Sequence, residues 1–268
     1  MKSSISASFF CCFKACIDGF RDGCRPYLSI DSTALNGMWN GHTLTACAID
    51  GHNRLFLVAF ELFESETKEN WAWFLEQLRS KGLIEAVKQV FPWAEHRECF
   101  RHLMENMKKN FTGTEYAKYM WPAARAYTPK KHRSKFSELI KCDYINNNLA
   151  ESWNSWIKEL KNLPPDAMAD AIRERMVVLF EKRRKISSAL SGTILPAVFH
   201  QLNAASKGLT HLRVTKGNSE QAEVTEIYKD EAVRRHVVYL KDHHCTCRQW
   251  KISGKPCPHA LALITTER

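Results

Sequence analysis

A cluster of three cysteines and one histidine near the C-terminus constrains the fold of this chain more than any other feature. The stretch CTCRQWKISGKPCPHALALI places Cys245, Cys247, Cys257 and His259 at the spacing Cys-x-Cys, nine residues, Cys-x-His. Alternate residues of a strand point to one face, so the first two cysteines can reach one ion together. Pro258 suits the first position of a helix. Three thiolates and one imidazole complete a closed tetrahedral zinc site, which is a structural site rather than a catalytic one.

Two alternatives to this ligand set stay open, namely chance clustering and the two neighbouring histidines. His243 and His244 compete with His259 for the ion, but they do not pair with Cys257. Ten cysteines among 268 residues are fewer than a disulfide scaffold carries. We therefore expect reduced thiols, a reducing compartment and structural Zn²⁺.

The size and charge of the chain favour a globular protein with an acidic partner. Hydrophobic residues make up 44% of the 268 positions, which predicts a packed core. No apolar run reaches the ~20 residues that a membrane helix needs, so we expect no membrane partner. A net charge of +10 favours DNA, and the alternative is a merely soluble basic protein. The candidate DNA-binding residues are Lys108, Lys109, Lys130, Lys131, Arg183 and Arg184. For each of these basic runs, the alternative is a solvated helix face.

The N-terminal part of the chain predicts three antiparallel strands. Residues 27–34, 44–49 and 54–63 are apolar and rich in strand-forming residues. Asp50 and Gly51, between the second and third runs, are a hairpin signal.

Helical patterns follow these strands. Residues 66–91 have apolar residues at helical spacing, with a break expected at 80–82. Residues 94–99 predict a short strand. Residues 146–165 begin with asparagine caps and end at a proline pair, and 166–190 predict a long helix.

The C-terminal cluster, with Trp250 three residues after the second cysteine, resembles the SWIM zinc finger. In plants that finger closes the transposases of the Mutator-like elements (MULE). Residues 19–78, 81–109 and 142–164 resemble the start, middle and end of that family's transposase domain, in the family's order. The resemblance implies an α/β (α+β) fold, with an RNase H-like mixed sheet, helices and a small C-terminal zinc finger.

Three parts are expected along the chain. A transposase-like domain would occupy residues 1–165, a helical or linker region 166–225, and the zinc finger 226–268. The resemblance also implies a nuclear protein, with DNA as its partner and a protein partner at the finger as a further expectation.

The family cuts DNA with two Asp and one Glu that hold two divalent metal ions, for which Mg²⁺ or Mn²⁺ is suited. The first Asp carries over to Asp31 and the Glu to Glu151. The alternative for Glu151 is a capping box with Asn148. Cys99 and His102 match the family's C-x-x-H motif, although such a pair alone is more often part of a core.

The second Asp of the family has no counterpart here. In relatives it ends a strand between two helices that resemble 66–91, and no Asp occurs from Leu57 to His102. We therefore expect an internal deletion of one strand, and an N-terminal truncation, because the family's N-terminal DNA-binding region is absent. Three functions follow as alternatives. They are a zinc- and DNA-binding protein that has lost catalysis, an active transposase, and a truncated product without function.

Overall fold

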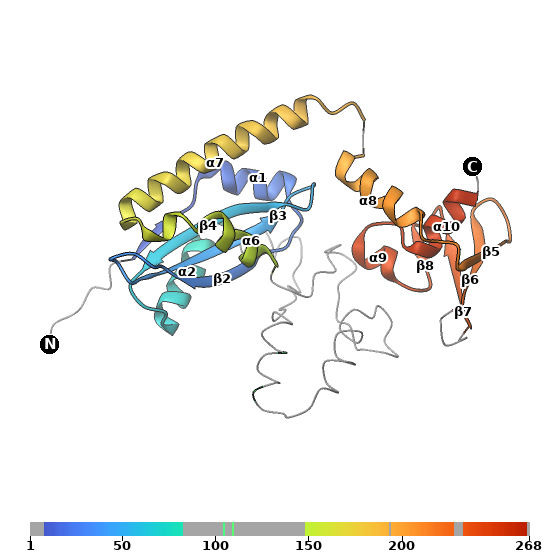
Figure 1. Ribbon diagram of the computed structural model, residues 1–268, viewed down its shortest axis with the longest axis horizontal. Helices are drawn as coiled ribbons and strands as arrows, with labels where there is room; N and C mark the ends of the chain where they lie inside the picture. Colours follow the sequence, from blue (N-terminus) through green and yellow to red (C-terminus); the bar gives the residue numbers. More distant parts are fainter. Residues whose placement is uncertain are drawn as a thin grey trace. The chain divides into compact units, whose positions relative to one another are not determined.

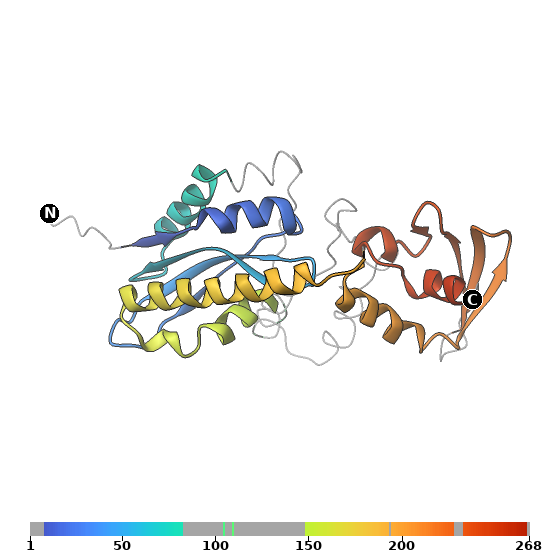
Figure 2. The ribbon, with the colours of Figure 1, turned by 90° about the horizontal axis from the view of Figure 1, so that it is seen from above.

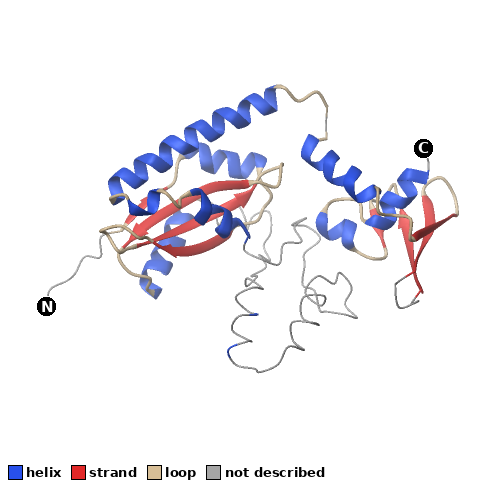
Figure 3. Cartoon of the chain, in the orientation of Figure 1, coloured by secondary structure: helices blue, strands red, loops and turns tan. Residues whose placement is uncertain are grey.

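The computed structural model of the chain describes residues 8–82, 104, 109, 148–192, 194–227 and 233–266. The chain divides into two compact units, one formed by Met1–Ala94 with Asn147–Thr193 and the other by Glu95–Asn146 with Ile194–Arg268. Each unit holds a four-stranded antiparallel sheet, red in Figure 3. The predicted α+β class is confirmed, and every strand pair among the described residues is antiparallel. None of the described helices is long and apolar enough to cross a membrane.

The first sheet has the strand order β1-β4-β3-β2. Its strands are β1 (Phe9–Cys11), β2 (Ser29–Ala34), β3 (His42–Ile49) and β4 (Leu55–Phe63). The sequence predicted the three longer strands and missed β1, which has only three residues. Within the part of the chain described here, β2 is an edge strand that pairs with β3 alone.

The turn between β3 and β4 confirms the predicted hairpin, but the residue with a left-handed backbone is not the glycine of the Asp-Gly pair. The Asp50 carboxylate accepts hydrogen bonds from the backbone N–H groups of His52 (2.9 Å) and Arg54 (2.8 Å). Asn53, rather than Gly51, adopts the left-handed conformation, with φ of 59°. Asp50 thus satisfies the donors of a turn longer than the two-residue type.

Helices cover both faces of this sheet (Figures 1 and 2). Helices α1 (Lys14–Gly23) and α2 (Lys68–Ser80) lie on one face. Helix α6 (Asn148–Trp156) and helix α7 (Pro165–Ser188) lie on the other, joined by a 3₁₀ turn at Leu160–Asn162. The sequence predicted all of these helices except α1.

Helix α2 ends where the sequence predicted a break. Its N-cap is Thr67, whose hydroxyl accepts a hydrogen bond from the Asn70 N–H at 3.2 Å. At its C-terminus Gly82 adopts a φ of 68° and donates its N–H to the Arg79 carbonyl at 2.8 Å. A glycine in the left-handed region is a common way to end a helix. The predicted strand 94–99, and its expected pairing with 27–31, lie outside the described residues.

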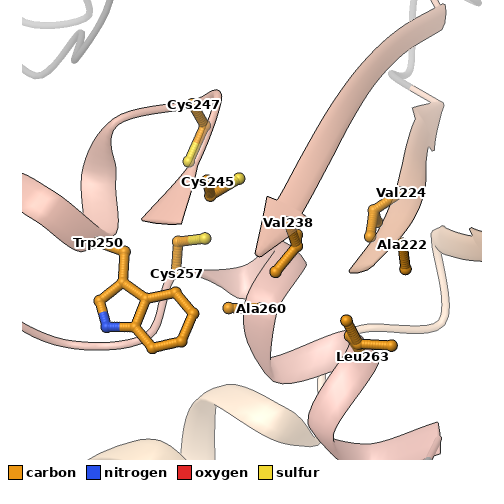
Figure 4. Close-up of a cluster of buried hydrophobic side chains, with 9 residues drawn as sticks. All are labelled: Ala222, Val224, Val238, Cys245, Cys247, Trp250, Cys257, Ala260 and Leu263. Carbon is orange, nitrogen blue, oxygen red and sulfur yellow. The ribbon is translucent and has the colours of Figure 1, made fainter. Parts of the chain in front are cut away.

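The second unit is built around the sheet β5-β6-β7-β8. Its elements are α8 (Pro196–Ser206), β5 (Leu212–Lys216), β6 (Gln221–Ile227), β7 (Val233–Tyr239), β8 (His244–Cys245), α9 (Gln249–Ser253) and α10 (Pro258–Thr266). Ala222, Val224 and Val238 on the sheet form a buried cluster with Ala260 and Leu263 of α10 (Figure 4).

Residues 166–225, expected as a separate helical or linker region, divide between the two units. Helix α7 belongs to the first unit, where Phe180 stacks on Phe56 with ring centroids 5.8 Å apart. Arg175 of the same helix donates to the Trp156 carbonyl at 2.5 Å. Helix α8, β5 and the first residues of β6 belong to the second unit. The three domain boundaries themselves stay a prediction.

Candidate metal centre

Two backbone connections hold the Cys-x-Cys segment in place. Cys245 pairs with Val238 across β7 and β8. Thr246, the residue between the two cysteines, exchanges two hydrogen bonds of 3.0 Å with Val237, one through its N–H and one through its hydroxyl. Thr246 was not among the residues that the sequence predicted for this site, because its contacts lie across the strand pair rather than along the chain. The chain then turns at Arg248, whose φ is 65°.

The second pair of ligands stands at the start of α10, as the sequence predicted. Cys257 precedes Pro258, and its carbonyl accepts the Leu261 N–H at 2.9 Å. His259 lies in the first turn of the same helix. Gly254, which ends α9 with a φ of 73°, allows the chain to return toward the first pair. Cys257 and His259 thus face the Cys-x-Cys segment from a rigid element.

The four predicted ligands come together. The ligand atoms of Cys245, Cys247, Cys257 and His259 lie within 4.8 Å of one another, and all four residues are buried. The Cys245 Sγ is 3.7 Å from the Nδ1 of His259. Tetrahedral zinc with ordinary Zn–S and Zn–N bonds separates such a pair by about 3.5 Å. The residues present therefore fit a four-coordinate ion, and Figure 4 shows the three cysteines against Val238, Trp250 and Ala260.

Hydrogen bonds within the cluster shift the pKa values of Cys245 and Cys257 in opposite directions. Hydrogen bonds from Cys245 and Cys247 lower the pKa of Cys257, whereas hydrogen bonds to Cys247 and Cys257 raise the pKa of Cys245. Burial lowers the pKa of His259, but its hydrogen bonds to the sulfur atoms of Cys247 and Cys257 outweigh burial and raise that pKa to about 10. A buried group of thiolates next to an imidazole is an environment that a divalent cation stabilises by replacing the protons.

The two rival histidines are engaged elsewhere. The ring of His243 packs against Trp250 with centroids 5.3 Å apart, and the ring of His244 stacks on Tyr239 at 5.7 Å. Among the described residues, the histidine grouped with the three cysteines is His259.

A second polar group adjoins the cluster and was missed by the sequence reading. Ligand-type atoms of Glu226, His236 and His259 also lie within 4.8 Å of one another. The Glu226 Oε2 is 3.5 Å from the Nε2 of His259. Glu226 and His236 stand on neighbouring strands before the first cysteine, and their spacing to the cysteines follows no ligand motif.

The candidate catalytic residue Asp31 lies on the face of the first sheet that α6 covers. Thr33 of the same strand accepts a hydrogen bond from the Lys161 Nζ at 2.7 Å, just beyond α6. Residues two apart in a strand share a face, so Asp31 points the same way as Thr33. The Asp31 carboxylate accepts the Ser32 N–H at 3.0 Å.

Helix α6 brings Glu151 to the same side of the sheet. This helix contacts β2 and β3, with Leu149 and Trp153 buried, while Glu151 is exposed in its first turn. The expected packing of this helix beside the Asp31 strand is present. The approach of the two carboxyl groups to each other stays a prediction.

A buried carboxylate that the sequence reading missed is Glu61 in the middle of β4. The residue has no exposed surface, and neither carboxylate oxygen has a hydrogen-bond partner among the residues that the structure describes. Burial raises its pKa to about 7. Glu61 is paired with Leu44, which is paired with Ser32, whereas Asp31 is in register with Thr45. Glu61 and Asp31 therefore point to opposite faces of the sheet.

The described basic residues differ in exposure. Lys109 is exposed, and Arg184 is exposed and paired with Glu181 at 2.8 Å. Arg183 instead lies 3.6 Å from the carboxylate of Asp50 and donates to the Leu55 carbonyl at 2.5 Å. Burial lowers the pKa of Arg183, and the charge of Asp50 acts against this. The other named candidates lie outside the described residues; they are Cys99, His102, Lys108, Lys130 and Lys131.

Comparison with known proteins identifies two segments of the chain. Residues 27–81 match the MULE transposase domain, and residues 236–267 match the SWIM zinc finger. No curated protein and no solved structure matches the chain significantly. The first match includes Asp31 and ends beside the C-terminus of α2, and the second includes all four clustered ligands. The chain therefore combines a MULE transposase domain with a C-terminal SWIM zinc finger, whose Cys/His cluster suits a structural zinc ion.

Proposed function

We propose that this protein is derived from a MULE transposase, binds zinc and DNA, and has lost DNA cleavage. The observation that carries the proposal is the contrast between its two sites. The C-terminal cluster assembles four buried ligands, Cys245, Cys247, Cys257 and His259, within 4.8 Å. By resemblance to the family, Asp31 and Glu151 correspond to two of its three metal-binding carboxylates, and no Asp occurs from Leu57 to His102 to supply the other.

The proposed role of zinc is structural. A bound ion would supply four strong bonds that join the β8 segment to the start of α10. The three thiolates would hold it from two sides, and the Nδ1 of His259 would complete a tetrahedron. Because four protein ligands would fill a tetrahedral ion, the arrangement would leave no coordination position for a catalytic water.

Binding to DNA is supported by the charge of the chain. A net charge of +10 attracts phosphate groups, and exposed side chains such as Lys109 and Arg184 are available to contact them. Such contacts are tolerant of sequence and weaken as salt rises. We therefore propose a nuclear protein that binds duplex DNA through its phosphates. A protein partner at the finger is a further proposal.

The proposed loss of cleavage follows from the ligands that two metal ions require. Paired ions must be held on both sides of the reacting phosphate, which three carboxylates achieve in the family. Asp31 and Glu151 are two, and the buried Glu61 points to the other face of the sheet. Two carboxylates hold one Mg²⁺ or Mn²⁺ weakly and do not align two.

An active transposase is the second candidate, favoured by one observation. Helix α6, which carries Glu151, packs over the sheet face to which Asp31 points. Residues outside the described part of the chain would then have to supply the third ligand.

One set of assays on the full chain separates these candidates. Fluorescence anisotropy with a labelled duplex should show binding that weakens steeply with salt. The same duplex should remain uncut in Mn²⁺ and in Mg²⁺, with the wild type and the Asp31→Ala variant indistinguishable. Mn²⁺-dependent cutting that Asp31→Ala abolishes would instead establish the active enzyme. Failure to melt cooperatively, together with no DNA binding at low salt, would point to a product without function.

A further inference from the structure

The inner face of the finger sheet changes from apolar to polar at one end. Ala222, Val224 and Val238 on this face are buried in the apolar cluster with α10. Glu226 lies two residues beyond Val224 on the same strand, so it shares that face, and its side chain is only 18% exposed. A carboxylate in such a place is costly without a partner.

On this face Glu226 lies beside the histidine of the metal cluster, whose buried Nε2 has no hydrogen-bond partner among the described residues. The other carboxylate oxygen of Glu226 lies 4.0 Å from the Nε2 of His211. The Glu226 Oε2 is 3.5 Å from the Nε2 of His259. The other ring nitrogen, Nδ1, is 3.7 Å from the Cys245 Sγ. The two nitrogens of one imidazole therefore face two different groups, with thiolates on one side and a carboxylate on the other.

We propose that Glu226 is a positioning residue of the zinc site, which accepts the Nε2–H of His259 and so directs its Nδ1 lone pair at the ion. This inference rests on the zinc binding proposed above. A neutral imidazole has one N–H and one lone pair, and the hydrogen bond made by one nitrogen decides which nitrogen is left to bind metal. A carboxylate in that place also makes the ligating nitrogen more basic.

His236 restrains the same ring from a neighbouring strand. Its ring centroid is 4.2 Å from that of His259. Its Nδ1 lies 3.4 Å from the hydroxyl of Thr246, the residue that joins the Cys-x-Cys segment to β7. The His259 ring thus lies between Glu226 and His236 on one side and the cysteine sulfurs on the other. Because these neighbours already restrict the ring, it loses less rotational entropy when it binds an ion.

A second ion is the alternative for this polar group, because Glu226, His236 and His259 also lie within metal-binding reach of one another. In that arrangement the His259 ring would have to bind through both nitrogens and give up both of its ring protons. A single ion leaves the Nε2–H in place as a donor to the carboxylate. We therefore expect one zinc per chain.

The first experiment measures the zinc affinity of the full chain by competition with a coloured chelator. Glu226→Ala should weaken zinc 10–100-fold, the loss typical of removing such a partner. Glu226→Gln, which keeps an acceptor oxygen without the charge, should recover part of this loss. The matched control is Glu223→Gln, a charge change on the same strand but on the opposite face, where Glu223 pairs with Arg235 at 3.8 Å. It should leave zinc affinity unchanged.

A second measurement determines which ring nitrogen of His259 is protonated and which binds the metal. Long-range ¹H–¹⁵N spectra of the zinc-loaded protein should show Nδ1 bound to metal and Nε2 protonated, and Glu226→Ala should shift the Nε2 resonance. Thermal melting with and without chelator provides a further check. Glu226→Ala should lower the Tm of the zinc-loaded chain and leave that of the zinc-free chain nearly unchanged.

Three outcomes would overturn the inference while leaving zinc binding intact. They are wild-type zinc affinity in Glu226→Ala, an equal loss of Tm with and without zinc, and a stoichiometry of two ions that falls to one in that variant. Failure of the proposed zinc binding looks different, because the wild type itself would then hold no zinc.

Discussion

Each of the two sheets carries a carboxylate with little or no exposure to solvent, and the surroundings of these two carboxylates differ. In the first unit, Glu61 is enclosed on β4, and none of the described residues gives it a hydrogen bond. In the second unit, Glu226 lies 3.5 Å from His259, which belongs to the metal cluster. The two units also differ in the size of the side chains that form their cores. The largest fully buried side chains, among them Trp153, Phe60 and Phe74, all lie in the first unit.

A core of that size can offset the cost of one unpaired polar group, because each large side chain contributes about 1.5–3 kcal/mol by its burial. The buried cluster of the second unit instead consists mostly of Ala, Val and Cys side chains. Small domains of this kind commonly depend on a metal for their stability. We therefore expect that burial of large apolar side chains stabilises the first unit. In the second unit, we expect that a bound metal and the polar residues around it do so.

The largest expected effect is the loss of the metal. Cys257→Ser should reduce the zinc content from one ion per chain to none and unfold the second unit, because structural zinc contributes on the order of 10 kcal/mol to small fingers. Hydrogen exchange should increase in β7 and α10 and remain unchanged in β3 and β4. Cys11→Ser, which replaces a half-buried cysteine of the first sheet, is the control and should retain zinc. Equal zinc content in Cys257→Ser would refute the ligand assignment.

The converse change should affect the first unit alone. Trp153 on α6 is 1% exposed, so Trp153→Ala should lower the free energy of unfolding by about 3–5 kcal/mol. Urea unfolding measures this loss, and zinc content should not change. Trp73→Ala on α2 provides the comparison, since that side chain is 38% exposed and should cost much less. If Trp153→Ala also released zinc, the two units would not be stabilised independently.

Glu61 should give the first unit a pH-dependent stability. Its pKa is raised from 4.5 to about 7 by burial, so between these values the folded state binds a proton that the unfolded chain has released. Stability should therefore fall as pH rises from about 4.5 to 7 and stay low above that. Glu61→Leu should remove this dependence and raise the free energy of unfolding by at most about 3 kcal/mol at alkaline pH.

The check is the Tm of Glu61→Leu and wild type across this pH range, with Glu64→Gln as an exposed control on the same segment. The two curves should converge at acid pH. A variant less stable than wild type at every pH would mean that the carboxylate contributes packing or contacts that outweigh its burial.

The smallest effects separate two adjacent arginines. Arg183→Met should cost about 1–3 kcal/mol of stability, because it leaves the half-buried carboxylate of Asp50 without its cation. Arg184→Met should leave the Tm unchanged, because Arg184 is exposed. For DNA binding, Arg184→Met should have the larger effect of the two variants. If Arg184 contacts a phosphate, the slope of log affinity against log salt concentration should fall by about one in this variant. Equal effects of the two variants on stability would contradict the placement of Arg183.

Local patterns were enough to predict much of this molecule. The β3–β4 hairpin, the end of α2 near Gly82 and the ligand set of the metal cluster were all legible in the sequence. In each case the residues that decide the structure lie in one short segment of the chain. Turn preferences, helix capping and ligand spacing therefore act without contacts from remote segments. The approach of Cys245 and His259, 14 residues apart, belongs to the same class.

Other features depended on residues that are remote in sequence. Arg183 lies in a basic run of the kind that contacts DNA. Only the packing of α7 brings it to Asp50 of the β3–β4 turn. In the sequence, Glu226 is one of several charged residues in a short strand. Only the packing of β6 against α10 places it beside His259. The sequence by itself determined which ligands exist and where the chain turns, because those are local matters of stereochemistry. The tertiary structure decided which charges are buried and what they meet, because burial depends on the sum of contacts from the whole unit.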